Sequence, residues 1–165
     1  MSSSPPPSLP QVSDLAFSPT NLELASASID GTVRVWSLES GVALAVLSVS
    51  KCVNCIAFSP SLDFPFLAAV SESPDEAGDS PPVGCLFSTV DWEAEPVMLE
   101  FPLVLGERAI RPSGSVLPNS HDSFTLGCVF SPSGQYLAVG LTRAPFMGVW
   151  RVADALANAP RGAGA

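Results

Sequence analysis

The stretch LASASIDGTVRVWSLESG, residues 24–41, contains two short segments in which apolar side chains alternate with small or polar ones. A period of two is the pattern of pleated strands, because successive side chains of a strand point to opposite faces of its sheet. Asp30 and Gly31 lie between the two segments and are typical residues of a tight turn. The stretch therefore predicts two antiparallel strands joined by a hairpin turn.

The surroundings of this stretch occur three times in the chain. Each copy begins with an apolar segment that ends in Phe-Ser-Pro, and two further apolar segments follow in the same order. The first segments are VSDLAFSP (12–19), VNCIAFSP (53–60) and FTLGCVFSP (124–132). A fourth apolar segment completes the first copy at 42–49 and the second at 97–105. Repeated groups of four short strands indicate a β-propeller, in which each repeat forms one blade.

The spacing of the copies agrees with this prediction. Phe17 and Phe58, from the first two Phe-Ser-Pro motifs, stand 41 residues apart, within the roughly 40 to 45 residues of a propeller repeat. The step from Phe58 to Phe130 is 72 residues, and two segments rich in Pro, Ser, Gly and charge account for the excess. Such segments are typical of surface loops.

The predicted fold class is all-β, a partial propeller of about three four-stranded antiparallel blades that does not close into a ring. The repeat region is expected at 11–156, between a disordered N-terminal segment at 1–10 and a disordered tail at 157–165. The blades are expected at about 12–49, 53–105 and 121–152, with loop insertions at 72–82 and 106–120.

The first copy resembles the WD40 repeat family. Members of this family join a Trp, an Asp, a Ser or Thr and a His in a hydrogen-bonded tetrad, and the resemblance places Trp36, Asp30 and either Ser26 or Ser28 in the first three positions. A closed network of this kind satisfies a buried indole N–H and a buried carboxylate together.

The other two copies match the tetrad less fully. The third has His121 and Trp150 in the tetrad positions but Ala144 where the Asp belongs, and the second has Phe87 in the Trp position. No blade therefore has a complete tetrad, and blade one is expected to be the best ordered and blade two the worst.

The order of the motifs is also similar to the propeller region of the bromodomain and WD repeat-containing family. The similarity rests on a blade ending in VRVW at 33–36, on Asp91-Trp92, on a Pro-rich linker at 101–120 and on the strand at 128–140. It implies a nuclear setting among chromatin-associated or ubiquitin-ligase adaptor proteins. The chain contains no bromodomain, and the Trp-Asp-x-Arg signature of ligase adaptors does not occur.

Charge and composition narrow the classes of function. Sixteen acidic and seven basic residues give a net charge of −9, which opposes direct binding to nucleic acid. Hydrophobic residues make up 47% of the chain, enough for a core, yet no apolar run approaches the roughly 18 residues of a membrane span. The start of the chain lacks the features of a signal peptide, so the expected location is intracellular, nuclear or cytoplasmic.

Residue types that carry catalysis or bind cofactors are few. Cys52 and Cys55 form a Cys-x-x-Cys motif, but a zinc site needs two further ligands, and packing is the favoured interpretation. His121, Asp122 and Ser123 are adjacent and so do not converge as a hydrolytic triad. Glycine-rich phosphate loops are absent. We therefore expect no metal, no cofactor and no enzymatic activity.

Two serines in the first insertion are candidate phosphorylation sites. Ser73 and Ser80 each precede a proline in an acidic segment. Phosphorylation there would add charge to a negative loop. The alternative is a linker in which Pro and Ser occur because they do not fold.

The function predicted from the sequence is a non-catalytic scaffold for protein–protein interaction. Its partner is expected to be another protein, and its open blade edges offer sites for docking or self-association. Two alternatives from other classes remain: a truncated or incomplete gene product with no independent function, and an enzyme.

Overall fold

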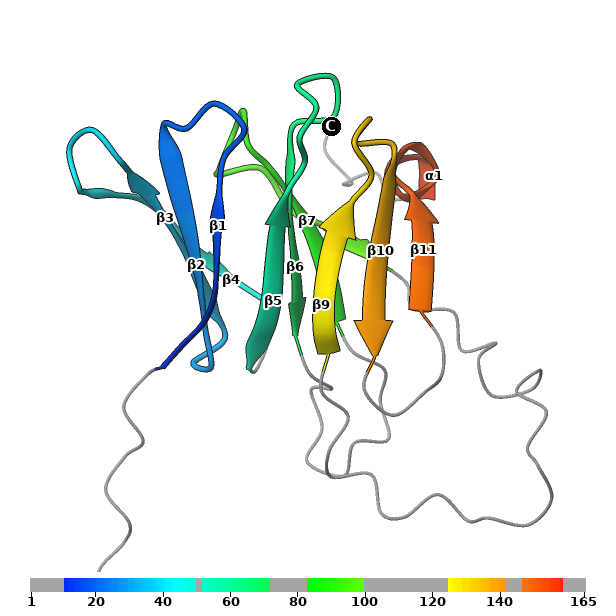
Figure 1. The fold of residues 1–165 in the computed structure, drawn as a ribbon, viewed down its shortest axis with the longest axis horizontal. Coiled ribbons are helices and arrows are strands. Elements are labelled where there is room, and N and C mark those ends of the chain that lie inside the picture. The colour runs from blue at the N-terminus through cyan, green and yellow to red at the C-terminus, as the bar shows by residue number, and fades with distance from the viewer. Residues whose placement is uncertain (1–10, 50–51, 72–82, 100–124, 142–146, 159–165) are drawn as a thin grey trace, which may run out of the picture.

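The three repeats form three separate antiparallel sheets that stand side by side (Figure 1). The structure is a computed structural model and describes residues 11–49, 52–71, 83–99, 125–141 and 147–158. The expected insertions at 72–82 and 106–120 lie outside the described residues, as do His121, Ser73 and Ser80.

Blade one contains four consecutive strands in chain order. These are β1 (Val12–Phe17), β2 (Glu23–Ser28), β3 (Thr32–Ser37) and β4 (Ala43–Ser48). Each strand pairs antiparallel with the next, and the turn at Asp30 and Gly31 joins β2 to β3. Gly31 has a φ of 87°, a conformation that glycine adopts without steric cost. The hairpin predicted from the alternation is therefore present.

Blade two has the same arrangement. Its strands are β5 (Val53–Phe58), β6 (Phe66–Ser71), β7 (Val83–Ser88) and β8 (Val97–Leu99), again in chain order. The all-β prediction of consecutive antiparallel sheets is confirmed for both blades.

Blade three differs from the expected four strands. The structure describes β9 (Thr125–Phe130), β10 (Tyr136–Leu141) and β11 (Met147–Arg151), followed by the helix α1 (Val152–Asn158) instead of a fourth strand. Val152 is fully buried, and α1 contacts both β11 and β8. The helix also extends two residues into the range that the sequence assigned to a disordered tail.

The first strands of the three blades lie next to one another. β5 contacts β1 on one side and β9 on the other (Figure 1). Two side chains of β1 fasten it to β5: the Ser13 hydroxyl donates to the Val53 carbonyl, and the Asp14 carboxylate accepts from the Ile56 N–H at 2.9 Å. The blades therefore fan out from a shared line of first strands, with blade two in the middle.

Two apolar clusters fill the spaces between the blades. The cluster between blades one and two contains Ala25, Ala27, Val33, Val35, Leu47, Val53, Ile56, Leu67, Ala69, Cys85 and Phe87. The cluster between blades two and three contains Cys55, Ala68, Val70, Leu86, Leu99, Phe130, Leu137, Val139 and Val152. Because side chains alternate between the faces of a strand, blade two buries both of its faces, whereas blades one and three each bury one.

The serine of the Phe-Ser-Pro motif holds the turn that follows the first strand. The Ser18 hydroxyl accepts from the Glu23 N–H at 3.1 Å, and the Ser131 hydroxyl accepts from the Tyr136 N–H at the same distance. These turns, together with β3–β4 and β7–β8, share one end of the strands, the upper end in Figure 1. The motif therefore closes the corresponding turn in blades one and three, whereas in blade two the Ser59 hydroxyl bonds to the Ser61 backbone.

Candidate functional site

The predicted tetrad residues of blade one fall into two groups. The Trp36 indole N–H donates to the Ser26 hydroxyl at 2.9 Å, which links β3 to β2. Asp30 instead accepts from the backbone N–H and the hydroxyl of Thr32, at 3.0 and 2.7 Å, and its own N–H donates to the Ser28 hydroxyl. The hydroxyl of Thr32 is the main reason that the pKa of the Asp30 carboxyl lies below its usual value. Asp30 and Ser28 thus hold the β2–β3 turn.

Trp36, Phe87 and Trp150 occupy the same place in their blades, and Phe87 and Trp150 each face the preceding blade. Phe87 belongs to the cluster between blades one and two, and Trp150 packs on the cluster between blades two and three. Trp36 points to the face of blade one that has no described sheet against it. We call this the leading face of blade one. The equivalent faces of blades two and three are covered by the preceding blade.

The leading face of blade one is exposed and mostly apolar, with the exposed Arg34 of β3 at its centre between Ser26 and Val46. Ser26 and Trp36 lie on it with four exposed side chains from β1 and β4. These are Leu15, Phe17, Leu44 and Val46. Several exposed apolar side chains on one face of a sheet are typical of a site of interaction.

The opposite end of the row has a second open face. Val129 and Val149 flank Ala138 in one row across β9, β10 and β11, and both are exposed. Tyr136 of β10 is exposed on the same face. We call this the trailing face of blade three. In blades one and two the equivalent face is buried against the next blade along the chain.

The cysteines serve packing and local hydrogen bonding. The Cys52 thiol donates to the Asn54 side chain at 3.2 Å. The pKa of the Cys128 thiol is raised by its hydrogen bond with Cys55 and by its burial. Burial raises the pKa of the Cys85 thiol to about 11. Within the described residues, no group of three His, Cys, Asp or Glu side chains is placed to hold a metal ion.

The high pKa of Cys85 leads to a test of reactivity. A rise from 9.0 to about 11 lowers the thiolate fraction at pH 8 by about 100-fold, and the thiolate is the form that reacts. We expect iodoacetamide to modify the half-buried Cys52 at least tenfold faster than Cys85 in the native chain, as followed by peptide mass spectrometry. Equal rates in urea would serve as the control, and equal rates in the native chain would contradict the burial of Cys85.

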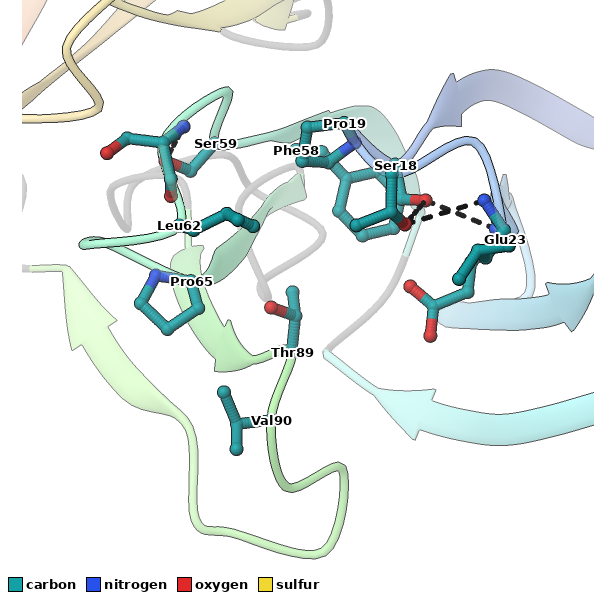
Figure 2. A pocket seen from close by; sticks show the side chains of 12 residues that line it. Ser18, Pro19, Glu23, Phe58, Ser59, Leu62, Pro65, Thr89 and Val90 are labelled. Atoms are coloured by element: carbon teal, nitrogen blue, oxygen red, sulfur yellow. Dashed lines mark hydrogen bonds between the residues drawn. The ribbon is translucent and has the colours of Figure 1, made fainter.

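A pocket of about 370 Å³ opens between the turns of blades one and two (Figure 2). Leu22 and Glu23 line it from the β1–β2 turn, Leu62 from the β5–β6 turn, and Thr89 and Val90 from the β7–β8 turn. This pocket was not predicted from the sequence, because its walls come from three turns that are distant in the chain. The available signal was the presence of large apolar residues in turns that are otherwise polar.

The sheets, their shared line of first strands and their open outer faces define a partial β-propeller. Residues 6–37 match the family model described as WD domain, G-beta repeat. The chain therefore carries a WD40 repeat in blade one, and the resemblance to the WD40 repeat family is confirmed. The similarity to bromodomain and WD repeat-containing proteins stays a prediction.

Similar proteins point to the same fold. Over 59 residues the chain is 44% identical to the ribosome biogenesis protein BOP1 homolog of Oryza sativa subsp. japonica, a match that covers 36% of this chain and 9% of that protein. The structure of U3-55K is similar with a TM-score of 0.58 and 20% identity, over 87% of this chain and 36% of that one.

The β-propeller domain of Myceliophteria thermophila Cps50 (Swd1) is similar with a TM-score of 0.60 and 17% identity, over 87% of this chain and 39% of that chain. This chain thus spans less than two fifths of the length of either solved propeller. No helix in the described ranges is long and apolar enough to cross a membrane.

Proposed function

We propose that the chain is a non-catalytic scaffold that binds another protein through the leading face of blade one. The observation that carries this proposal is the equivalence of Trp36 with Phe87 and Trp150. At the latter two positions a neighbouring sheet covers the aromatic ring. At Trp36 the same kind of surface is open.

The chemistry of the covered faces describes the partner. The face of blade one that packs on Phe87 is made of small and β-branched side chains, including Ala25, Ala27, Val33 and Val35. A surface that fits the leading face should therefore be another twisted sheet with small apolar side chains, which is the trailing face of a propeller blade. Binding of this kind requires shape and apolar area, and it involves no chemical step.

The setting of this scaffold is also part of the proposal. The relative in Oryza sativa is named as a ribosome biogenesis protein, which supports a role in an assembly of that process and a nuclear location. Chromatin-associated and ubiquitin-ligase adaptor settings stay predictions from the sequence, as does the absence of direct contact with nucleic acid. Sedimentation of the tagged chain with pre-ribosomal particles would support the first setting, and free sedimentation would contradict it.

Site-specific photo-crosslinking tests the scaffold itself. A benzoylphenylalanine at Phe17, whose side chain is 64% exposed on the leading face, is expected to crosslink in cells to a peptide from a propeller repeat, identified by mass spectrometry. The same group at Glu39, an exposed residue of the β3–β4 turn, provides the control and is expected to give no such product. Absence of a crosslink at Phe17, or the same products at both sites, would contradict the proposal.

A further inference from the structure

We propose that the pocket between the turns of blades one and two binds a short protein segment in which a basic side chain lies beside apolar ones. This site is separate from the leading face of blade one, so the inference goes beyond the scaffold function proposed above. Three features carry it: the exposed apolar residues around the pocket, the charge of its walls and the rigidity of its turns.

Large apolar side chains from three different turns meet at this pocket. Leu22 is 64% exposed, Leu62 is 73% exposed and Val90 is 79% exposed, and all three line it. Phe58 adds an aromatic wall at the end of β5 (Figure 2). Exposed apolar residues are common singly, but their convergence on one hollow is typical of a site that receives another apolar group.

The charge around the pocket is of one sign. Glu23 is the charged residue of the lining, and it forms no ion pair with a described side chain. The turns at 18–23, 58–66 and 88–96 contain five acidic residues and no basic one. The acidic residues are Glu23, Asp63, Asp91, Glu93 and Glu95. A cationic partner is therefore attracted to this end of the sheets, and an anionic one is repelled.

Glu23 adds a specific contact to this general field. Its carboxylate points into the space between the turns rather than along the sheet (Figure 2). Partial burial raises its pKa, since the charged form loses water there without gaining a positive neighbour. An arginine side chain would supply that neighbour through a charge-assisted hydrogen bond.

The walls of the pocket are held in place before any partner arrives. The Ser18 N–H donates to the Glu23 carbonyl at 3.0 Å, and the Ser18 hydroxyl accepts from the Glu23 N–H. The Thr89 N–H donates to the Pro65 carbonyl at 2.9 Å, which ties the β7–β8 turn to the β5–β6 turn. A preformed site loses little conformational entropy on binding, so even a short segment gains affinity from it.

The volume limits the size of the bound group. About 370 Å³ lies at the lower end of the roughly 300 to 1,000 Å³ of ligand pockets. This space accommodates a few side chains of an extended segment, with the basic group at Glu23 and its apolar neighbours against Leu62 and Val90.

Methyl NMR on the full 165-residue chain tests the inference. The probes are two capped pentapeptides, acetyl-Gly-Leu-Arg-Leu-Gly-amide and the same peptide with Glu in place of Arg. We expect the Arg peptide to shift the methyl resonances of Leu22, Leu62 and Val90 in a saturable way, and the Glu peptide to bind at least tenfold more weakly. Higher salt should also weaken the Arg peptide, because screening reduces the attraction.

Matched variants assign the charge effect to one carboxylate. Glu23→Gln keeps the size of the side chain and is expected to weaken binding of the Arg peptide by about fivefold. Glu39→Gln removes the same charge from the same end of blade one outside the pocket, and it is expected to change the affinity by less than twofold. Circular dichroism confirms that each variant is folded.

The possible contrary results are distinct. Equal binding of the two peptides, or equal weakening by Glu23→Gln and Glu39→Gln, would overturn the role of Glu23 and with it the inference. Shifts confined to Val46 or Val129 would overturn the pocket while supporting the open blade faces as binding surfaces. Absence of saturable shifts for the Arg peptide would overturn the inference. The scaffold proposal would be unaffected by that result, because the crosslinking experiment tests it separately.

Discussion

Leu67→Ala is expected to lower the free energy of unfolding by about 2 to 5 kcal/mol, because it leaves a cavity in the cluster between blades one and two. Leu67 lies in β6 and is 0% exposed. Domains of ordinary stability unfold at a cost of about 5 to 15 kcal/mol, so this loss would remove a large part of the total. Urea denaturation followed by circular dichroism measures the change.

Leu62→Ala is the matched control for this substitution. It makes the same chemical change in the same blade, but Leu62 is largely exposed at the β5–β6 turn. Its effect is expected to stay within about 0.5 kcal/mol, as for most surface positions. Equal losses for the two variants would mean that β6 is not at the centre of a packed stack of sheets.

Gly134→Ala is expected to destabilise the chain by about 2 to 4 kcal/mol, through two effects that act together. Gly134 lies in the β9–β10 turn with a φ of +71°, which is strained for a residue with a side chain. An added Cβ would also lie 2.6 Å from the Ser59 hydroxyl oxygen and 2.8 Å from the Ser61 Cβ, both in the neighbouring blade. Thermal denaturation of the variant measures the combined effect.

Gly41→Ala separates the two effects. Gly41 has the same φ of +71°, but an added Cβ would meet nothing within 4 Å. This variant should lose only the conformational part, about 1 to 2 kcal/mol. The excess loss in Gly134→Ala then reports the close approach of the turns of blades two and three, and a loss no larger than that of Gly41→Ala would show that these turns do not touch in solution.

The periodic parts of the fold were predictable from the sequence, because each strand repeats a local pattern. The Phe-Ser-Pro motifs located β1, β5 and β9, and the alternation around Arg34 located β3. The helix α1 was not predicted from the sequence. Its seven residues from Val152 come directly after the third repeat, where a fourth strand was expected, and before a tail rich in Ala and Gly. Its first residue, Val152, is buried in the cluster between blades two and three, and α1 contacts β8, an arrangement that no local pattern reveals.

Motif completeness turned out to be a poor guide to packing. Blade two, which has Phe87 in place of a Trp, is the blade with both faces buried, and its lower order relative to blade one stays a prediction. Its position between two neighbours determines this, and position in a stack is a property of the whole chain. The pocket was missed for the same reason, since Leu22, Leu62 and Val90 are brought together only when the blades pack side by side.

The direction of the strands gives the two ends of the sheets different freedom to change. The short turns that surround the pocket all lie at one end, and β4, β6, β8 and β10 all end at the other. Insertions and deletions between the end of each of these strands and the start of the next can therefore accumulate over evolution while the opposite rim keeps its shape. Segments at the far end of the sheets can therefore be lengthened or replaced without changing the shape of the proposed ligand pocket at the near end.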